Sequence, residues 1–569
     1  MKEKIIIIVT ILLLLFNVSM FCQQPYMVKD INPGPNSSIV VPYFTPIDNN
    51  LFFSANNGTN GVELWKSDGS SAGTVMVRDV FPGSESGNAF NSPPININGI
   101  IYFAGNDGIN GRELWKSDGT EAGTVMVKNI NVYPNFSDGS SDPGMFAEVN
   151  GVFFFRCNNI DNGYELWKSD GTANGTIMVK DIFTGNNQNG TPNSSVPFSL
   201  TNVNGTLFFA ASDANNGTEL WKSDGTEAGT VIVGGQPGFQ SSIGSYPNFT
   251  NVNGILYYAG YSQSNNRDLE LWKSDGTDAG TVLVKDIYPG YNAQYNFFYE
   301  GSPHNLTNVN GTLFFSACDS EVNSNNRNFE LWKSDGTAAG TTKVKEIRPE
   351  PVNYGSFPAS LVNANGTLYF AANDGINGIE MWKSDGTETG TTLVKDLYAG
   401  VGNSEPREFV NINGAIYFIA NDGIIGQELF RTDGTANGTT GYNMRFLDES
   451  SSPEYLTNVN GKLFFTASNG GQNGRELWVL DTNLLSTSEY ITSDNKFSIF
   501  PNPTNNILTI HNLENKLIDK ITISDLTGKK VLEQNNNSNT INVENLQNGM
   551  YLLQILSEGK SAVSKFIKN

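Results

Sequence analysis

One eight-residue stretch recurs along most of this chain and constrains its fold more than any other feature. Its full form is Glu-Leu-Trp-Lys-Ser-Asp-Gly-Thr, as at 113–120, and a Gly-Thr pair follows at 123–124. Nine copies, spaced by about 50 residues, indicate a repeat whose units pack against their neighbours. We expect the large aromatic residue of each copy to pack between units and the lysine after it to be exposed. Phe430 takes the aromatic position in one copy, and the other copies hold all eight tryptophans: Trp65, Trp115, Trp167, Trp221, Trp272, Trp332, Trp382 and Trp478.

Each repeat contains four short strand-like runs separated by turn signals. In the seventh copy these runs are 360–363, 367–372, 380–384 and 391–397. Eight copies have Asn-Gly between the first two runs, and we assign Asn49-Asn50 to that turn in the first copy. Asn-Gly is a strong hairpin signal because both central residues of a type I′ turn have positive φ. The second run is almost continuously apolar, as expected for a strand covered on both faces, so the repeat predicts the four-stranded blades of a β-propeller.

The two ends of the repeat region complement each other. Residues 26–31 match the fourth run of a repeat, whereas the ninth copy has only the first three runs (456–459, 463–467 and 476–478) and stops at Asp481. An N-terminal strand that completes the last blade would close the ring and cover both sheet edges. We therefore predict an all-β fold, a closed propeller of about nine four-stranded blades over 25–481. An open solenoid would instead need polar caps.

Connection lengths distinguish two faces of the predicted ring. The distance from the repeat aromatic to the glycine of the next Gly-Thr is eight positions wherever that pair is present. The connection from the second run to the third varies: the last aromatic of the second run precedes the repeat glutamate by ten positions in most copies, by 12 from Tyr258 to Glu270 and by 15 from Phe315 to Glu330. The connection from the fourth run to the next repeat also varies, and in an antiparallel blade both open on one face. Variable loops on a rigid scaffold usually carry binding, so we place any ligand on this face, with simple drift of exposed loops as the alternative.

The most irregular stretch of the predicted variable face is 288–304, beside the long 316–328 loop. Exposed aromatic rings with a nearby carboxylate suit stacking on sugar rings, so we predict a glycan-binding face here. Packing of this loop over a blade edge is the alternative. The residues of the predicted ligand face are Tyr291, Tyr295, Phe297, Phe298, Tyr299 and Glu300.

The sequence offers few residues for catalysis or metal binding. His304 and His511 are its only histidines, which argues against a histidine-based zinc site or a Ser/His/Asp triad. We expect His304 to be an ordinary loop residue, and Cys157 and Cys318 to be buried without a disulfide. We predict no catalytic residue and no cofactor. Ca²⁺ is the one metal we consider, at the Asn-Asp-Gly loops at 106–108, 373–375 and 421–423.

The aspartate of each repeat has an expected structural role. Asp118 and its counterparts in the other copies are expected to cap their turns through side-chain to backbone hydrogen bonds.

The net charge of −22 and the pI near 4.5 argue against a nucleic-acid partner, because nucleic acids bind Lys/Arg-rich surfaces.

The first 24 residues read as a secretory signal peptide. Lys2 and Lys4 precede an apolar segment at 5–16, which is too short for a membrane span. Lipid attachment at Cys22 is the alternative, although the small residue expected just before a lipidated cysteine is missing. We predict no membrane span in the mature chain.

Two parts of the chain resemble known families. The repeat resembles the ELWxxDGT repeat family of exported Bacteroidota proteins, and the match is complete in the second to sixth copies. Residues 482–496 read as a polar linker, and 497–569 has alternating strands that suggest a small β-sandwich. This segment resembles a type A sorting domain of the type IX secretion system through 500–503, 523–530, 546–552 and 565–569. The resemblance implies export by that machinery, removal of the tail, and release or attachment at the outer cell surface.

Neither resemblance supplies a catalytic residue. We therefore favour a secreted or surface-displayed binding or adhesion module whose partner is a glycan or another surface molecule. One alternative is an extracellular hydrolase of the glycosidase type, which needs two carboxyls about 5–10 Å apart on the variable face. The other alternative is a purely structural surface component.

Overall fold

The computed structural model describes residues 24–482 and 497–568, except for 40–41, 88–91, 133–138, 235–242, 244–245, 262–267, 294–296, 324–325, 350–353, 425, 443, 445–449, 469–472, 513–517, 526–528, 536–538 and 558–559. The predicted signal peptide, except for Gln24, therefore lies outside the described residues. The chain divides into two compact units, of which Gln24–Thr482 is the larger. Every regular element named among the described residues is a β-strand, and no helix there has the length and apolarity needed to cross a membrane.

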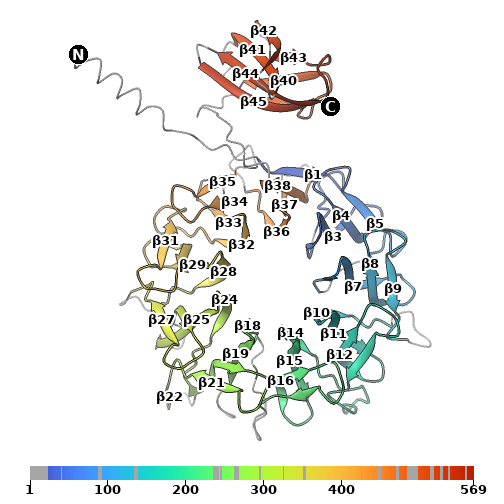
Figure 1. Cartoon of the computed structure of the whole chain (residues 1–569), viewed down its shortest axis with the longest axis vertical. Helices are drawn as coiled ribbons and strands as arrows, with labels where there is room; N and C mark the ends of the chain where they lie inside the picture. Colours follow the sequence, from blue (N-terminus) through green and yellow to red (C-terminus); the bar gives the residue numbers. More distant parts are fainter. Residues whose placement is uncertain are drawn as a thin grey trace. The chain divides into compact units, whose positions relative to one another are not determined.

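The described part of the larger unit contains nine four-stranded sheets and one two-stranded sheet, and Figure 1 shows the nine following one another in chain order. In each of sheets 1 to 8 the four strands are consecutive in sequence and antiparallel. Sheet 1 contains β2 (Thr45–Ile47), β3 (Asn50–Asn56), β4 (Val62–Ser67) and β5 (Val75–Arg78). Sheet 2 contains β6 (Ile95–Ile97), β7 (Ile100–Asn106), β8 (Arg112–Ser117) and β9 (Val125–Lys128). Sheet 3 contains β10 (Gly144–Val149), β11 (Val152–Asn159), β12 (Gly163–Ser169) and β13 (Ile177–Lys180). Sheet 4 contains β14 (Phe198–Val203), β15 (Thr206–Asp213), β16 (Gly217–Ser223) and β17 (Val231–Ile232).

The remaining sheets include the two longest strands of the larger unit, which lie in sheet 6. Sheet 5 contains β18 (Thr250–Val252), β19 (Ile255–Tyr261), β20 (Leu269–Ser274) and β21 (Val282–Lys285). Sheet 6 contains β24 (His304–Val309), β25 (Thr312–Asn323), β26 (Asn326–Ser334) and β27 (Thr342–Lys345). Sheet 7 contains β28 (Ala359–Ala364), β29 (Thr367–Asn373), β30 (Ile379–Ser384) and β31 (Thr392–Lys395). Sheet 8 contains β32 (Arg407–Ile412), β33 (Ala415–Asn421), β34 (Gln427–Thr432) and β35 (Thr440–Tyr442). Sheet 9 contains β36 (Glu454–Val459), β37 (Lys462–Ser468), β38 (Arg475–Asp481) and, from the N-terminus, β1 (Tyr26–Lys29).

The core lies between consecutive sheets. Leu64 of sheet 1 packs in one buried cluster with Ile101, Phe103 and Trp115 of sheet 2. The second strand of each sheet is covered on both faces, as predicted; β3, for example, has five consecutive buried residues at 51–55. These strands are apolar on both faces because each face meets a neighbouring sheet.

The turn between the first and second strands has the conformation predicted from Asn-Gly. Asn98 and Gly99 both have positive φ, at 52° and 84°. In the first copy the turn lies one residue earlier than the predicted Asn49-Asn50. Ile47 ends β2 and pairs with Asn50 of β3, so the two turn residues are Asp48 and Asn49.

Sheets 9 and 1, at opposite ends of the sequence, contact each other. Met27 of β1 pairs with Trp478 of β38, so β1 forms the fourth strand of sheet 9. Phe53 of sheet 1 shares a buried cluster with Phe464 of sheet 9. The side-chain amide of Asn460 also donates to the carbonyl of Asp48 over 2.7 Å. The first strands of the two sheets, β36 and β2, are in contact as well.

The C-terminal unit has two sheets. One contains β39 (Phe497–Phe500), β40 (Ile507–Asn512) and β43 (Thr540–Asn542); the other contains β42 (Lys530–Gln534), β41 (Lys520–Asp525), β44 (Gly549–Ser557) and β45 (Lys560–Lys568). Leu508 and Ile541 of the first sheet share a buried cluster with Ile523 and Phe566 of the second. The two sheets thus enclose one core.

Candidate functional site

The strand pairing separates two kinds of connection. In sheets 1 to 8, turns of nearly constant form join strands one and two, and strands three and four, at one end of the sheet, which we call the fixed face. In sheet 9 such a turn joins only strands one and two, because β1 comes from the N-terminus. The other connections lie at the opposite end, which we call the variable face. Equivalent turns of neighbouring sheets meet: the amide of Asn150 in sheet 3 donates to the carbonyl of Gly205 in sheet 4 over 3.0 Å.

The longest connection between two sheets and the longest excursion from a second strand to a third, measured from the aromatic to the repeat glutamate, both involve sheet 6. The chain between sheets 5 and 6 forms a small hairpin of β22 (Tyr291–Asn292) and β23 (Phe297–Phe298), and we call residues 288–301 the hairpin insert. In sheet 6, β25 and β26 extend beyond the length of their counterparts and pair as far as Asn323 and Asn326. We call this the β25–β26 extension.

The hairpin insert contains the predicted aromatic residues. The side chain of Tyr291 is exposed, and its ring centroid lies 5.0 Å from that of Phe298. Tyr299 stacks on Tyr288, with centroids 4.5 Å apart and planes 15° apart. The backbone of Phe297 belongs to β23, and Tyr295 lies outside the described residues. Part of the aromatic surface thus packs within the insert, and Tyr291 is the predicted aromatic that is described as exposed.

Arg327 connects the hairpin insert to the β25–β26 extension. Its guanidinium donates to the hydroxyl of Ser302 over 3.1 Å and to the carbonyl of Glu300. It lies 4.0 Å from the Glu300 carboxylate. The same guanidinium lies over the ring of Phe329, 5.1 Å from its centroid, a cation–π arrangement. The two inserts therefore form one continuous piece of the variable face.

His304 is not the loop residue that we expected. It begins β24, and its Nδ1 donates to the carbonyl of Ser302 over 3.0 Å. Its ring packs edge-on against Phe329, with centroids 5.1 Å apart. Burial lowers the pKa of His304, which favours a neutral imidazole that packs beneath the insert.

Glu270 holds both ends of the hairpin insert. The backbone NH of Ile287 donates to one carboxylate oxygen over 2.8 Å, and that of Gly301 donates to the other over 2.5 Å. Burial raises the pKa of Glu270 to about 8, although these two hydrogen bonds lower it. Oxygen atoms of Asp268, Glu270 and Asp286 lie within 4.8 Å of one another. Glu270 is buried and accepts hydrogen bonds from two backbone NH groups. These contacts indicate that it anchors the insert.

The same glutamate is buried in all nine sheets, and sequence reasoning missed this role. In sheet 2, Glu113 accepts the backbone NH of Ile130 over 2.8 Å and the hydroxyl of Ser141 over 2.7 Å, and both donors belong to the connection to sheet 3. Burial raises the pKa of Glu113 to about 7. The signal was present in the sequence, because this glutamate begins all nine repeat copies. The nine residues are Glu63, Glu113, Glu165, Glu219, Glu270, Glu330, Glu380, Glu428 and Glu476.

The expectation of an exposed repeat lysine was wrong. Lys116 is half-buried, and its ammonium donates to the carbonyl of Gly171 in the next sheet over 2.9 Å. The last residue of the fourth strand makes a second such bond: Lys180 donates to the carbonyl of Thr230 over 2.8 Å and lies 5.9 Å from the centroid of the Trp221 ring. The ammonium group at each of these positions donates to a backbone carbonyl of the next sheet. This contact explains why the lysine side chain is partly buried.

The aspartates of the repeat cap turns, as predicted. One carboxylate oxygen of Asp118 accepts the backbone NH of Thr120 over 2.8 Å and its hydroxyl over 2.7 Å. In the Asn-Asp-Gly loop considered for Ca²⁺, Asp107 accepts the backbone NH groups of Ile109 and Asn110 over 2.9 and 2.8 Å. Its second oxygen accepts the Asn110 amide over 2.7 Å. Both oxygens of Asp107 are thus engaged inside their own loop.

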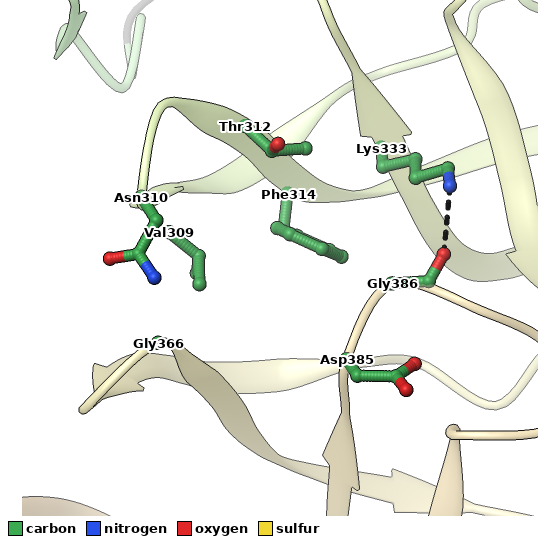
Figure 2. Close-up of a pocket in the computed structure, with 8 residues that line it drawn as sticks. All are labelled: Val309, Asn310, Thr312, Phe314, Lys333, Gly366, Asp385 and Gly386. Atoms are coloured by element: carbon green, nitrogen blue, oxygen red, sulfur yellow. Dashed lines mark hydrogen bonds between the residues drawn. The ribbon is translucent and has the colours of Figure 1, made fainter.

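A pocket of about 230 Å³ lies on the fixed face, between sheets 6 and 7. It is bordered by Asn310 and Phe314 of sheet 6 and by Gly366 and Asp385 of sheet 7 (Figure 2). Lys333 closes one side by donating to the carbonyl of Gly386 over 2.8 Å. The loop lengths predict binding on the opposite face, so this pocket is not predicted from the sequence.

Comparison with known proteins identifies the C-terminal unit. Residues 498–569 match the family model described as a secretion system C-terminal sorting domain. The chain carries a type IX sorting domain. This domain indicates export to the cell surface or secretion, and recognition by the type IX secretion machinery, as the sequence predicted. No curated protein matches the chain.

Solved structures match the chain at low sequence identity and with low TM-scores. PorZ, a surface component of the type IX secretion system of Porphyromonas gingivalis, is 11% identical with a TM-score of 0.32, and the match covers 92% of this chain and 75% of PorZ. The extracellular domain of a putative one-component system from B. thetaiotaomicron is 12% identical with a TM-score of 0.29, over 92% of this chain and 74% of that one. A puromycin hydrolase is 11% identical with a TM-score of 0.34, over 79% and 61% of the two chains.

Proposed function

We propose that this protein is an exported β-propeller of nine blades that binds a partner at the outer cell surface through its variable face. The proposal takes residues 1–24 as the signal peptide and the repeat region as a member of the ELWxxDGT family of Bacteroidota. The mature propeller is then released or attached to the surface after its sorting domain has served export.

The contacts between sheets 9 and 1 support a closed ring. β1 completes sheet 9, and Glu476 of that sheet accepts the backbone NH of Ile31 over 3.1 Å and the hydroxyl of Ser38 over 2.5 Å. The connection from β1 to sheet 1 is therefore held by a glutamate in the same way as the connections between the other sheets. An open array would leave β38 as an edge strand that invites pairing with another chain.

The observation that carries the binding role is the junction made by Arg327. The hairpin insert lies in the longest connection between sheets, and the β25–β26 extension is the longest excursion from a second strand to a third. Arg327 joins the two by hydrogen bonds to Ser302 and Glu300. A rigid scaffold that holds two joined inserts at one place is typical of a binding site. The exposed ring of Tyr291 suits stacking on a sugar, so the proposed partner is a glycan.

A glycan array tests this role with the secreted mature protein. We expect wild-type protein to bind a defined set of glycans, and Tyr291→Ala to weaken that binding at least tenfold. Tyr246→Ala is the matched control, because Tyr246 is also an exposed tyrosine in a connection between sheets. Absence of any bound glycan would exclude the proposed partner class. Equal effects of the two substitutions would exclude the hairpin insert as the site.

We do not extend the proposal to hydrolysis. A glycosidase needs two carboxyls that face its substrate. Glu270, at the centre of the acidic group with Asp268 and Asp286, is buried and hydrogen-bonded to backbone NH groups on both oxygens. A purely structural surface role is the remaining alternative, and it predicts that the array shows no binding.

A further inference from the structure

The connection between sheets 6 and 7, on the variable face, adds exposed aromatic surface beside the proposed site. Tyr354 and Phe357 lie in this connection, and 47% of each residue is exposed. The ring centroid of Phe357 lies 5.6 Å from that of Phe329, and the guanidinium of Arg327 lies over the Phe329 ring. The aromatic surface is therefore continuous with the junction that Arg327 makes between the hairpin insert and the β25–β26 extension.

Phe357 departs from its equivalents in the other sheets. It directly follows Ser356, whose hydroxyl donates to the repeat glutamate Glu330 over 2.6 Å. In six other connections an equivalent residue follows the serine or glycine that donates to the repeat glutamate. Phe357 is the one aromatic residue at this position in the described part of the chain, so the scaffold does not require a ring there. The other six residues are Ile39, Asp142, Val196, Ser302, Glu405 and Ser452.

Arg348 departs from its equivalents by its charge. Its backbone NH donates to Glu330 over 3.2 Å. The same hydrogen bond to the repeat glutamate is made in four other connections by residues without a positive charge, so Arg348 adds a cation to this connection that they lack. These four residues are Phe81, Asn131, Phe183 and Tyr398.

The guanidinium of Arg348 is not neutralised by the described part of the chain. Its carbon Cζ lies 5.5 Å from the centroid of the Tyr354 ring, in a cation–π arrangement. No described carboxylate forms an ion pair with it, and its buried Nε–H has no acceptor among the described residues. A half-buried arginine held by an exposed ring, without an anion of its own, suits recognition of an anionic group.

Tyr354 and Phe357 lie close enough for one short oligosaccharide to reach both. Two residues separate them, so their Cα atoms lie at most about 11 Å apart. The two intervening residues, Gly355 and Ser356, are buried. A Cβ on Gly355 would overlap the backbone nitrogen of Phe329. The backbone between the two rings therefore packs against sheet 6, which fixes the place of both rings.

We infer that the proposed glycan site takes an acidic sugar, in which a carboxylate or a sulfate ester binds Arg348 beside Tyr354 and a neighbouring sugar ring covers Phe357. This inference rests on the proposed function and names the class of glycan. The C–H faces of sugar rings are apolar, so covering Phe357 removes apolar surface from water. The guanidinium forms paired, charge-assisted hydrogen bonds with an oxyanion. Because the net charge of −22 repels anions at long range, a local cation is needed to hold one.

Paired probes that differ in charge test the inference with the mature wild-type protein. The array carries oligosaccharides of uronic acids beside their methyl esters, and sulfated galactose oligosaccharides beside their desulfated forms. The first pairs test the carboxylate, and the second pairs test the sulfate ester. We expect the bound glycans to be acidic, and the neutral form of each to bind more weakly by at least about tenfold, as the loss of a charge-assisted hydrogen bond predicts.

Two substitutions assign the preference to this connection. Arg348→Gln is expected to abolish the difference between the acidic and neutral forms, while leaving binding of the neutral form unchanged. Phe357→Ser, which introduces a residue that the repeat accepts at 302 and 452, is expected to weaken binding of both forms. Arg112→Gln is the matched control, because Arg112 already forms an ion pair with Asp142, and it should change neither.

The outcomes separate this inference from the proposed function. Absence of any bound glycan overturns the proposed function and this inference with it. Glycan binding that is equal for charged and neutral forms, or a preference for acidic forms that survives Arg348→Gln, overturns this inference alone.

Discussion

The backbone NH of Ile31 lies 3.1 Å from a carboxylate oxygen of Glu476, a residue 445 positions further along the chain. The same carboxylate accepts the backbone NH and the hydroxyl of Ser38, over 3.2 and 2.5 Å. One buried side chain of sheet 9 thus satisfies three donors of the N-terminal segment. Its loss would remove the acceptor of the buried backbone NH of Ile31, whereas the NH of Ser38 also donates to the carbonyl of Arg475 over 3.2 Å. A buried donor left without an acceptor costs about 1–3 kcal/mol.

Glu476→Ala is therefore expected to lower the free energy of unfolding by several kcal/mol, roughly 2–5, and to expose the N-terminal segment. Urea denaturation measures the first effect, and limited proteolysis followed by mass spectrometry measures cleavage within residues 24–40. Glu121→Ala is the control, because Glu121 is exposed in a turn of sheet 2. Equal stability of the two variants would contradict the role given to Glu476.

The stability of the larger unit is expected to fall as pH rises from about 4.5 to about 8. Burial raises the pKa of Glu63, Glu113, Glu165, Glu330 and Glu476 from 4.5 to about 7, and that of Glu270 to about 8. In this window the folded chain holds protons that the unfolded chain has lost, so raising the pH favours unfolding. Each such group contributes at most about 1.4 kcal/mol per pH unit.

Urea denaturation at several pH values checks this dependence. Glu113→Gln should flatten the slope, because the amide does not titrate in this range, whereas Glu121→Gln should leave it unchanged. A stability that rises steadily from pH 5 to 8 would contradict the assigned direction.

Arg327→Ala is expected to separate the hairpin insert from the β25–β26 extension. The substitution removes the donors to Ser302 and Glu300, so backbone amides within 288–302 should exchange with deuterium faster, by at least tenfold. Arg112→Ala is a matched control, since Arg112 forms a half-buried ion pair of 2.6 Å with Asp142 in another part of the larger unit. Unchanged exchange at the insert in Arg327→Ala would show that other contacts hold it.

A pair of glycine substitutions separates backbone strain from steric conflict on the fixed face. Gly99 and Gly386 have almost the same φ, 84° and 87°. A Cβ at Gly99 meets nothing within 4 Å, whereas one at Gly386 lies 3.0 Å from Phe314. We expect Gly99→Ala to cost about 1–2 kcal/mol of unfolding free energy from positive φ alone. Gly386→Ala should cost about 1–3 kcal/mol more, and equal losses in urea denaturation would contradict the conflict with Phe314.

Deletion of residues 498–569 is expected to abolish export, because these residues form the sorting domain. The measurement is the fraction of the protein found in the medium or on intact cells, by immunoblotting. A variant with the exposed Glu544 changed to Gln is the control and should be exported normally. Export of the truncated chain would contradict the assignment.

The repeat made the strands predictable from sequence. Asn-Gly predicted the turn at Asn98 and Gly99 because only a few residue types accept positive φ, and the apolar second strand predicted cover on both faces. The complementary ends predicted that residues near Tyr26 would pair with the last repeat, and the pairing of Met27 with Trp478 agrees.

Contacts between sheets were less accessible to sequence reasoning. The repeat lysine looks like a solvated residue in the pattern, and only the positions of Lys116 and Gly171 show that it satisfies a neighbour's carbonyl. The role of Glu113 was missed because its partner Ser141 lies 28 residues away, in a connection whose length varies. The pocket at Phe314 lies between turns of constant length, so a comparison of loop lengths does not detect it.

The pairing of β1 with β38 also sets a temporal order. A ribosome makes the chain from its N-terminus, so the strand at Tyr26–Lys29 emerges long before its partner at Arg475–Asp481. During that interval β1 has no native strand to pair with, and sheet 9 cannot be completed. The last hydrogen bonds of the larger unit therefore form only after about 450 intervening residues have been synthesised, and slow closure of so distant a contact is the expected final folding step. In a nascent chain that ends before Arg475, β1 would be unpaired. It could then pair with the exposed edge strand of another sheet.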